Sequence, residues 1–149
     1  MLLKNSEHRD RIKEVINSDN FFNHMHKKIE TLEAPPAKGD FSQGIVAGNM
    51  VFTTGQINLT PDGTLLTGTI EEETHQVMKN LEHILGAAEA SFRDVVKTTV
   101  YLTDLTVYDR VKKVYAEYVS DPAPARETVG VASLPLGARI QISMVAVKS

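Results

Sequence analysis

The distribution of apolar residues changes character near Met25. Before this point, Ile12, Val15 and Ile16 recur at helical spacing among charged residues, without the alternation typical of a strand. We therefore expect a short amphipathic helical extension over residues 1–24 and a folded domain over residues 25–149.

Three short runs with β-type patterning open the expected domain. The predicted strands cover residues 28–32, 44–47 and 50–56. The second and third runs flank Gly48 and Asn49, which adopt positive φ readily and so favour a hairpin turn. The domain should therefore begin with a three-stranded unit.

A core helix is expected after these strands. Thr69 and Glu72 have the spacing of a capping box, in which a hydroxyl and a carboxylate each bind a backbone N–H at the start of a helix. The apolar residues of one helical face follow: Val77, Met78, Leu81, Ile84, Leu85 and Ala88.

A strand and a second helix come next. Residues 95–103 are rich in β-branched side chains, as in a buried strand. Thr106 and Asp109 repeat the capping spacing, and Asp121-Pro122 is expected to end the helix that they begin. The apolar face of this helix consists of Val111, Val114, Tyr115 and Tyr118.

Two further strands are predicted over residues 126–132 and 139–147, on either side of a turn at 134–137. The resulting order is βββ-α-β-α-ββ, which indicates an α+β domain of two layers, a mixed sheet with two helices on one face. The other face carries too many apolar residues to be left in water, so we expect the chain to oligomerise through it.

Composition narrows the class of protein. The 149 residues are 42% hydrophobic and 23% charged, as expected for one soluble domain, and the net charge of −3 with dispersed lysines argues against a nucleic-acid partner. No apolar run has the roughly 20 residues that a membrane span needs. Without cysteine, disulfides and thiolate sites are excluded, and the cytoplasm is the expected location.

Candidate functional residues stand beside predicted strands. Arg126 follows a proline-stiffened connection, and a guanidinium held there can bind a carboxylate through two parallel hydrogen bonds. Thr54 and Gly55 close the third strand, where the missing side chain lets backbone N–H groups approach a ligand oxygen. Phe41 lies in a polar segment bounded by glycines. Each residue also has an ordinary structural explanation, so the patterns alone leave both interpretations open.

The histidines do not have the spacing of a metal site. His75 and His83 lie far apart on the predicted helix, and His24 and His26 have no carboxylate pair nearby. No serine lies in a nucleophile elbow, and no glycine-rich phosphate loop opens either helix. We therefore expect neither a metal nor a cofactor.

Several short segments together resemble one protein family. They are Ala34-Pro35, residues 39–44 (GDFSQG), 52–56 (FTTGQ), Asn80-Leu81, 94–104 (DVVKTTVYLTD), 124–126 (PAR) and Leu134-Pro135. In this order they resemble the Rid family of reactive-intermediate enamine/imine deaminases, the YjgF-type proteins, some of which are labelled L-PSP endoribonucleases. The resemblance covers residues 25–147. Met25 lies where chains of this family typically begin, which favours treating residues 1–24 as an extension.

The resemblance implies a chorismate-mutase-like fold that forms a homotrimer, with ligand clefts between neighbouring subunits. It also implies hydrolysis of enamines and imines such as 2-iminobutanoate or 2-iminopropanoate to a 2-oxo acid and ammonia, without cofactor or metal. On this basis Arg126 is the carboxylate-binding arginine. Gly55 and Thr128 offer backbone contacts, and Thr128 stands where many deaminating members have cysteine.

The chain departs from the family pattern at other site positions. Thr54 replaces a common serine and keeps the hydroxyl, whereas Phe41 replaces the usual tyrosine and loses it. Gln141 replaces the glutamate that is proposed to activate water, and an amide can position water but cannot accept its proton. Asp40 is an alternative proton acceptor. Glu127 is discounted because it should point to the strand face opposite Arg126.

Three functions follow as hypotheses. The first is a deaminase in which Arg126 holds the substrate carboxylate and Thr54 and Gln141 place water. The second is a non-catalytic binder or sensor of small carboxylates such as 2-oxo acids, which Gln141 favours. The third is an endoribonuclease, for which the sequence shows neither a histidine pair nor a basic groove.

Overall fold

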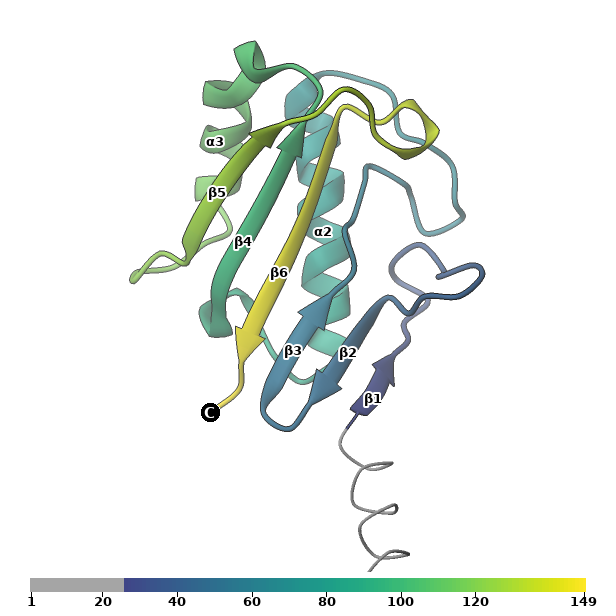
Figure 1. Ribbon diagram of the computed structural model, residues 1–149, viewed down its shortest axis with the longest axis vertical. Coiled ribbons are helices and arrows are strands. Elements are labelled where there is room, and N and C mark those ends of the chain that lie inside the picture. Colours follow the sequence, from purple (N-terminus) through teal and green to yellow (C-terminus); the bar gives the residue numbers. More distant parts are fainter. Residues whose placement is uncertain (1–25) are drawn as a thin grey trace, which may run out of the picture.

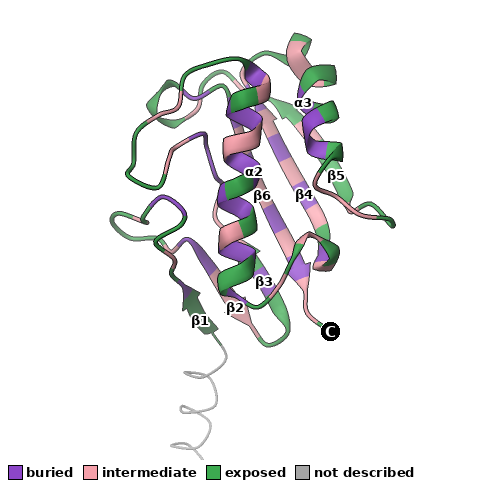
Figure 2. Cartoon of the chain, turned by 180° about the vertical axis from the view of Figure 1, so that it is seen from behind, coloured by how far each residue is buried: buried purple, intermediate pink, exposed green. Residues whose placement is uncertain are grey.

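Among the described residues, six strands form one mixed sheet, and the two α-helices lie together on one face of it (Figures 1 and 2). This computed structural model describes residues 26–149, so the predicted helical extension over residues 1–24 lies outside the described residues. The arrangement confirms the expected α+β fold with two layers. The order of elements is also the predicted one.

The sheet combines four antiparallel strand pairs with one parallel pair. Its strands are β1 (His26–Ile29), β2 (Gly44–Ala47), β3 (Met50–Thr53), β4 (Val95–Leu102), β5 (Ala125–Gly130) and β6 (Ile140–Val147). Their spatial order is β1-β2-β3-β6-β4-β5, and β4 and β5 run parallel while the other neighbours run antiparallel. The early three-stranded unit and β5 therefore lie at opposite edges of the sheet (Figure 1).

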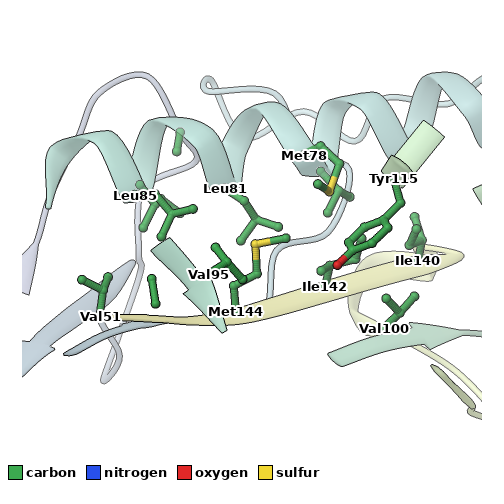
Figure 3. Packing of buried hydrophobic residues seen from close by; sticks show 14 of the residues in the cluster. Val51, Met78, Leu81, Leu85, Val95, Val100, Tyr115, Ile140, Ile142 and Met144 are labelled. Carbon is green, nitrogen blue, oxygen red and sulfur yellow. The ribbon is translucent and has the colours of Figure 1, made fainter. Parts of the chain in front are cut away.

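Helix α2 (Ile70–Ala87) supplies the main core-facing surface. Its predicted cap is confirmed, since the Glu72 N–H donates to the Thr69 hydroxyl at 3.2 Å and the Thr69 N–H donates to the Glu72 carboxylate at 2.7 Å. All six apolar residues of the predicted face are buried. Figure 3 shows its side chains packed on β4 and β6.

Helix α3 (Tyr108–Ala116) begins differently from the prediction. The expected capping box of Thr106 and Asp109 does not form, because the Asp104 carboxylate accepts from the Thr106 N–H at 2.9 Å and starts a short 3-10 helix over Leu105–Val107. The helix proper then follows Val107, which has no side-chain cap.

The end of α3 also comes earlier than expected. The helix stops at Ala116, before Asp121-Pro122, and Tyr118 just beyond it packs edge-on against His75 and Phe92. The Arg110 guanidinium of α3 binds the Glu71 carboxylate of α2 through two hydrogen bonds of 2.6 Å. The hydrogen bonds from Arg110 lower the pKa of Glu71 to about 2. They also connect the surfaces of α3 and α2.

Strand β1 ends before the predicted limit of residue 32, because a side chain forms hydrogen bonds with the backbone that follows it. The Gln43 amide accepts from Thr31 N–H at 2.7 Å and donates to the carbonyls of Thr31, Ala34 and Pro35 at 3.0, 3.2 and 2.8 Å. Gln43 is only 4% exposed, so these bonds replace a strand ladder in a buried place. The loop that precedes β2 is therefore held to the domain by one glutamine.

The sheet face away from the helices is not covered within the chain. Strand alternation and pairing put Ile45, Met50, Phe52, Val145 and Val147 on this face. Met50 and Phe52 remain 36% and 40% exposed. An apolar face of this kind favours association, and the oligomer expected from the sequence stays a prediction.

Candidate functional site

Arg126 lies at the edge of the sheet, on the side that carries the helices. It pairs with Thr98 of β4, whose side chain is fully buried below α3, so Arg126 projects toward the same side. Its Nη2 donates to the Tyr108 hydroxyl at 2.8 Å. The guanidinium carbon lies 5.8 Å from the centre of the Tyr108 ring and 4.9 Å from that of Tyr115.

These contacts orient the guanidinium without neutralising it. Aromatic faces attract a cation through their quadrupole and leave its charge unpaired. None of the ion pairs within residues 26–149 involves Arg126. The N–H groups that Tyr108 does not take are therefore free for a ligand carboxylate.

A hollow of about 400 Å³ opens in front of this arginine. Leu105, Tyr108, Arg126 and Thr128 line it. Thr128 pairs with the buried Val100 and so faces the same way as Arg126, two positions along β5. The structure thus brings together two of the predicted site residues, with an apolar and an aromatic wall.

A second group of predicted residues surrounds a bulge at the end of β3. Phe52 pairs with Val145, and Gln56 pairs with Ile142. The chain therefore advances four residues after Phe52 while β6 spans three, so one extra residue bulges out of the pairing. The Met144 N–H donates to the Thr53 hydroxyl at 2.9 Å in place of a backbone acceptor. The predicted third strand therefore ends at Thr53, and the next two residues leave the ladder.

The bulge puts Gly55 against Gln141. A Cβ built on Gly55 would lie 2.5 Å from the Gln141 Nε2 atom and 2.8 Å from its Cδ atom. The Thr54 N–H donates to the Gln43 carbonyl at 2.9 Å, which ties the bulge to the loop that carries Phe41. Gly55, Gln141 and Thr54 thus form one continuous region, and Phe41, 52% exposed, lies on the adjoining loop.

The two groups are not brought together within one chain. Gln141 pairs with Tyr101 and alternates with the buried Ile140 and Ile142, so it projects from the uncovered face. Arg126 projects from the opposite face, and β4 and β6 separate its strand from β3. A site that uses both groups therefore needs a second copy of the chain.

The alternative proton acceptors lie away from Arg126. Glu127 pairs with Thr99 on the other strand face, as expected, and its carboxylate is 3.1 Å from the Lys97 ammonium. Asp40 is exposed on the Phe41 loop. Within residues 26–149 no group of three or more His, Asp or Glu side chains could hold a metal ion.

The sequence patterns missed Tyr108 as a partner of Arg126. Tyr108 precedes the expected apolar face of the helix, and Tyr115 was assigned to the core alone. An aromatic pair at this spacing on a helix that follows a β-strand could have suggested a ring platform. The sequence does not show which cation lies on these two rings. That follows only from the packing of α3 beside β5, the strand that carries Arg126 (Figure 1).

Comparison with known proteins assigns the family. The family model described as "Endoribonuclease L-PSP" matches residues 31–148. The chain belongs to the Rid/L-PSP family. The human 2-iminobutanoate/2-iminopropanoate deaminase is 39% identical over 125 residues, which are 83% of this chain and 91% of the human one.

Two other Rid/L-PSP relatives extend the comparison. Reactive Intermediate Deaminase A from Arabidopsis thaliana is 44% identical over 79% of this chain and 64% of its own length. The crystal structure of E. coli TdcF with bound serine has a TM-score of 0.78 at 35% identity and covers 83% of this chain and 99% of its own.

The location of the chain stays a prediction. The Arabidopsis relative is chloroplastic, so membership of the Rid/L-PSP family does not by itself favour the cytoplasm. No helix within residues 26–149 is long and apolar enough to cross a membrane.

Substituting Gly55 tests whether the Gln141 amide needs its observed position. Gly55→Ala is expected to push this amide away and to weaken ligand binding or turnover about tenfold, because a displaced polar group no longer meets its target. Gly86→Ala, near the end of α2 where an added Cβ meets nothing, should leave function unchanged and add roughly 0.5–1 kcal/mol of stability. Equal function in both variants would contradict a role for the contact. Ligand titration and urea unfolding provide the measurements.

Proposed function

We propose that this protein hydrolyses 2-imino acids and their enamine tautomers, of the 2-iminobutanoate or 2-iminopropanoate type, to 2-oxo acids and ammonia. The observation that carries the proposal is the Arg126 guanidinium, which forms no ion pair within residues 26–149 and lies on two tyrosine rings beside an open hollow. Relatives about 40% identical are named for this activity, which supports the same substrate class here.

The reaction needs water and a fixed substrate. Arg126 holds the carboxylate, which places the adjacent imine carbon beside the Thr128 backbone. Water adds its oxygen to that carbon, and one of its protons passes to the imine nitrogen, which gives a carbinolamine. The hydroxyl proton of the carbinolamine then passes to the same nitrogen as the carbon–nitrogen bond breaks, which releases ammonia and leaves a carbonyl. Thr54 and Gln141 are the residues that would position this water, and Phe41 would close the site.

We place the reaction between subunits of a homotrimer. Arg126 and Thr128 would come from one chain, and Thr54, Gly55, Gln141 and Phe41 from its neighbour. The opposite orientation of the two groups supports this arrangement, since one chain cannot use both on one ligand. The apolar residues on the uncovered face supply a surface for association.

Gln141 supports a second candidate, a binder of 2-oxo acids without turnover. Its amide cannot accept the proton of water, and a base in this role is typically worth about 10² to 10⁴ in rate. The amide also adds no negative charge beside a bound carboxylate, so binding can persist where catalysis is weak. An endoribonuclease activity is not favoured, because the chain has a net charge of −3.

The test compares imine turnover with ligand binding in the same preparation. An amino-acid oxidase generates the 2-imino acid in situ, and release of the 2-oxo acid is followed with and without this protein. Acceleration over buffer, with a trimeric mass by light scattering, supports the deaminase. Calorimetric binding of 2-oxobutanoate without acceleration supports the binder. A monomer that neither binds nor accelerates contradicts both.

A further inference from the structure

A second cation stands beside Arg126. The Lys112 ammonium of α3 lies 5.7 Å from the centre of the Tyr108 ring, the ring that Arg126 also approaches. Both residues, together with Tyr108 and Thr128, also line a tightly packed crevice next to the Arg126 hollow, which is too narrow to admit a water molecule. Both cations thus lie close to one aromatic ring, and that ring lines the opening of the hollow.

The walls of this opening leave the two charges largely unopposed. The described residues that line the hollow and the crevice include no Asp or Glu. Among the described residues, Lys112 forms an ion pair with Asp109, whose Oδ1 is 3.5 Å from the ammonium. That side chain is 82% exposed and Lys112 is 49% exposed, and such solvent-screened pairs contribute little to stability.

The two cations differ in what they can bind. Arg126 is oriented by a hydrogen bond and two rings, so it suits the planar carboxylate next to the reacting carbon. Lys112 has a flexible stem and a compact charge, so it can reach the far end of ligands of different length. A ligand with one carboxylate leaves Lys112 with only the solvent-screened Asp109 beside it.

We propose that the site prefers dicarboxylates, the four- or five-carbon 2-imino acids that carry a second carboxylate at the far end, and that Lys112 recognises this second charge. The proposal rests on the proposed function for the reaction, but the preference also applies to the matching 2-oxo acids if the protein only binds. Lys112 is then a residue that determines specificity and takes no part in the chemical step.

The experiment compares 2-oxoglutarate with 2-oxobutanoate by calorimetry, on the full chain at low ionic strength. We expect the dicarboxylate to bind about fivefold to tenfold more tightly, as for one additional charge-assisted hydrogen bond. Lys112→Gln should remove this preference and leave 2-oxobutanoate binding unchanged. Lys112→Arg should keep it. Asp109→Asn should strengthen it, because it removes the competing carboxylate.

The matched control is Lys113→Gln, an exposed neighbour on the same helix that lines neither opening. It should change neither affinity. Equal affinities in the parent, or a preference that survives Lys112→Gln, would overturn the proposal. The same ratio measured with imines, generated by oxidases acting on glutamate and on 2-aminobutyrate, tests the preference in turnover. Failure of turnover with both imines contradicts the deaminase and leaves the binding comparison decisive for Lys112.

Discussion

Replacing Arg126 by alanine is expected to abolish both carboxylate binding and imine turnover. The guanidinium would supply two charge-assisted hydrogen bonds to the substrate, and losing them should reduce kcat/KM by roughly 10²-fold or more. Arg126→Lys should recover little, because an ammonium cannot reproduce the two parallel hydrogen bonds of a planar guanidinium. Steady-state kinetics and calorimetry with 2-oxobutanoate provide the measurements.

The control for this loss is an arginine in a similar exposed setting. Arg93→Ala, in the short 3-10 helix over Phe92–Asp94, should leave both readings unchanged. Arg126→Ala should also unfold at nearly the same urea concentration as the parent, since its side chain is exposed. Retained affinity for 2-oxobutanoate in Arg126→Ala would remove the basis of the proposed function.

Introducing a base at position 141 should have the opposite effect on rate. Gln141→Glu is expected to raise turnover by about 10² to 10⁴, because a carboxylate can take a proton from the attacking water. The same change should weaken 2-oxobutanoate binding several-fold, because it puts a negative charge near an anionic ligand. Single-turnover kinetics and calorimetry separate these two effects.

Two controls test whether a rate gain in Gln141→Glu comes from the new carboxylate. They are the pH dependence of the rate and a variant with an uncharged side chain. The rate of Gln141→Glu should rise with pH as the new carboxylate loses its proton, whereas the parent should lack that step. Gln141→Met, similar in size and without a polar group, should not gain activity. A Gln141→Glu variant no faster than the parent would show that position 141 does not limit the reaction.

Local patterns predicted the elements wherever neighbouring residues decide the structure. The Thr69–Glu72 cap and the apolar face of α2 need only residues within the same helix, and both were correct. The Thr106–Asp109 cap does not form because Asp104 accepts from the Thr106 N–H, which the expected cap would give to Asp109, and starts a 3-10 turn first. The spacing of residues in the sequence does not show which of two overlapping caps will form.

The spatial arrangement of the candidate site residues could be predicted from the sequence only in part. Strand alternation correctly separated Arg126 from Glu127, because successive residues point to opposite faces. At the bulge that puts Gly55 beside Gln141, the Met144 N–H donates to the Thr53 hydroxyl, and these two residues are distant in the chain. Tyr108 meets Arg126 only because α3 docks beside β5. Such contacts arise from tertiary packing, which a periodicity does not encode.

The opposite projection of Arg126 and Gln141 from one sheet has a genetic consequence. If every reaction centre draws one half from each of two chains, two separately inactive variants can complement each other. Chains with Arg126→Ala can be co-assembled with chains whose Gly55 is replaced by a bulky residue. Some subunit interfaces in the mixed oligomer would then have both halves of the site intact. Activity should then appear in the co-expressed mixture although each parent preparation has none.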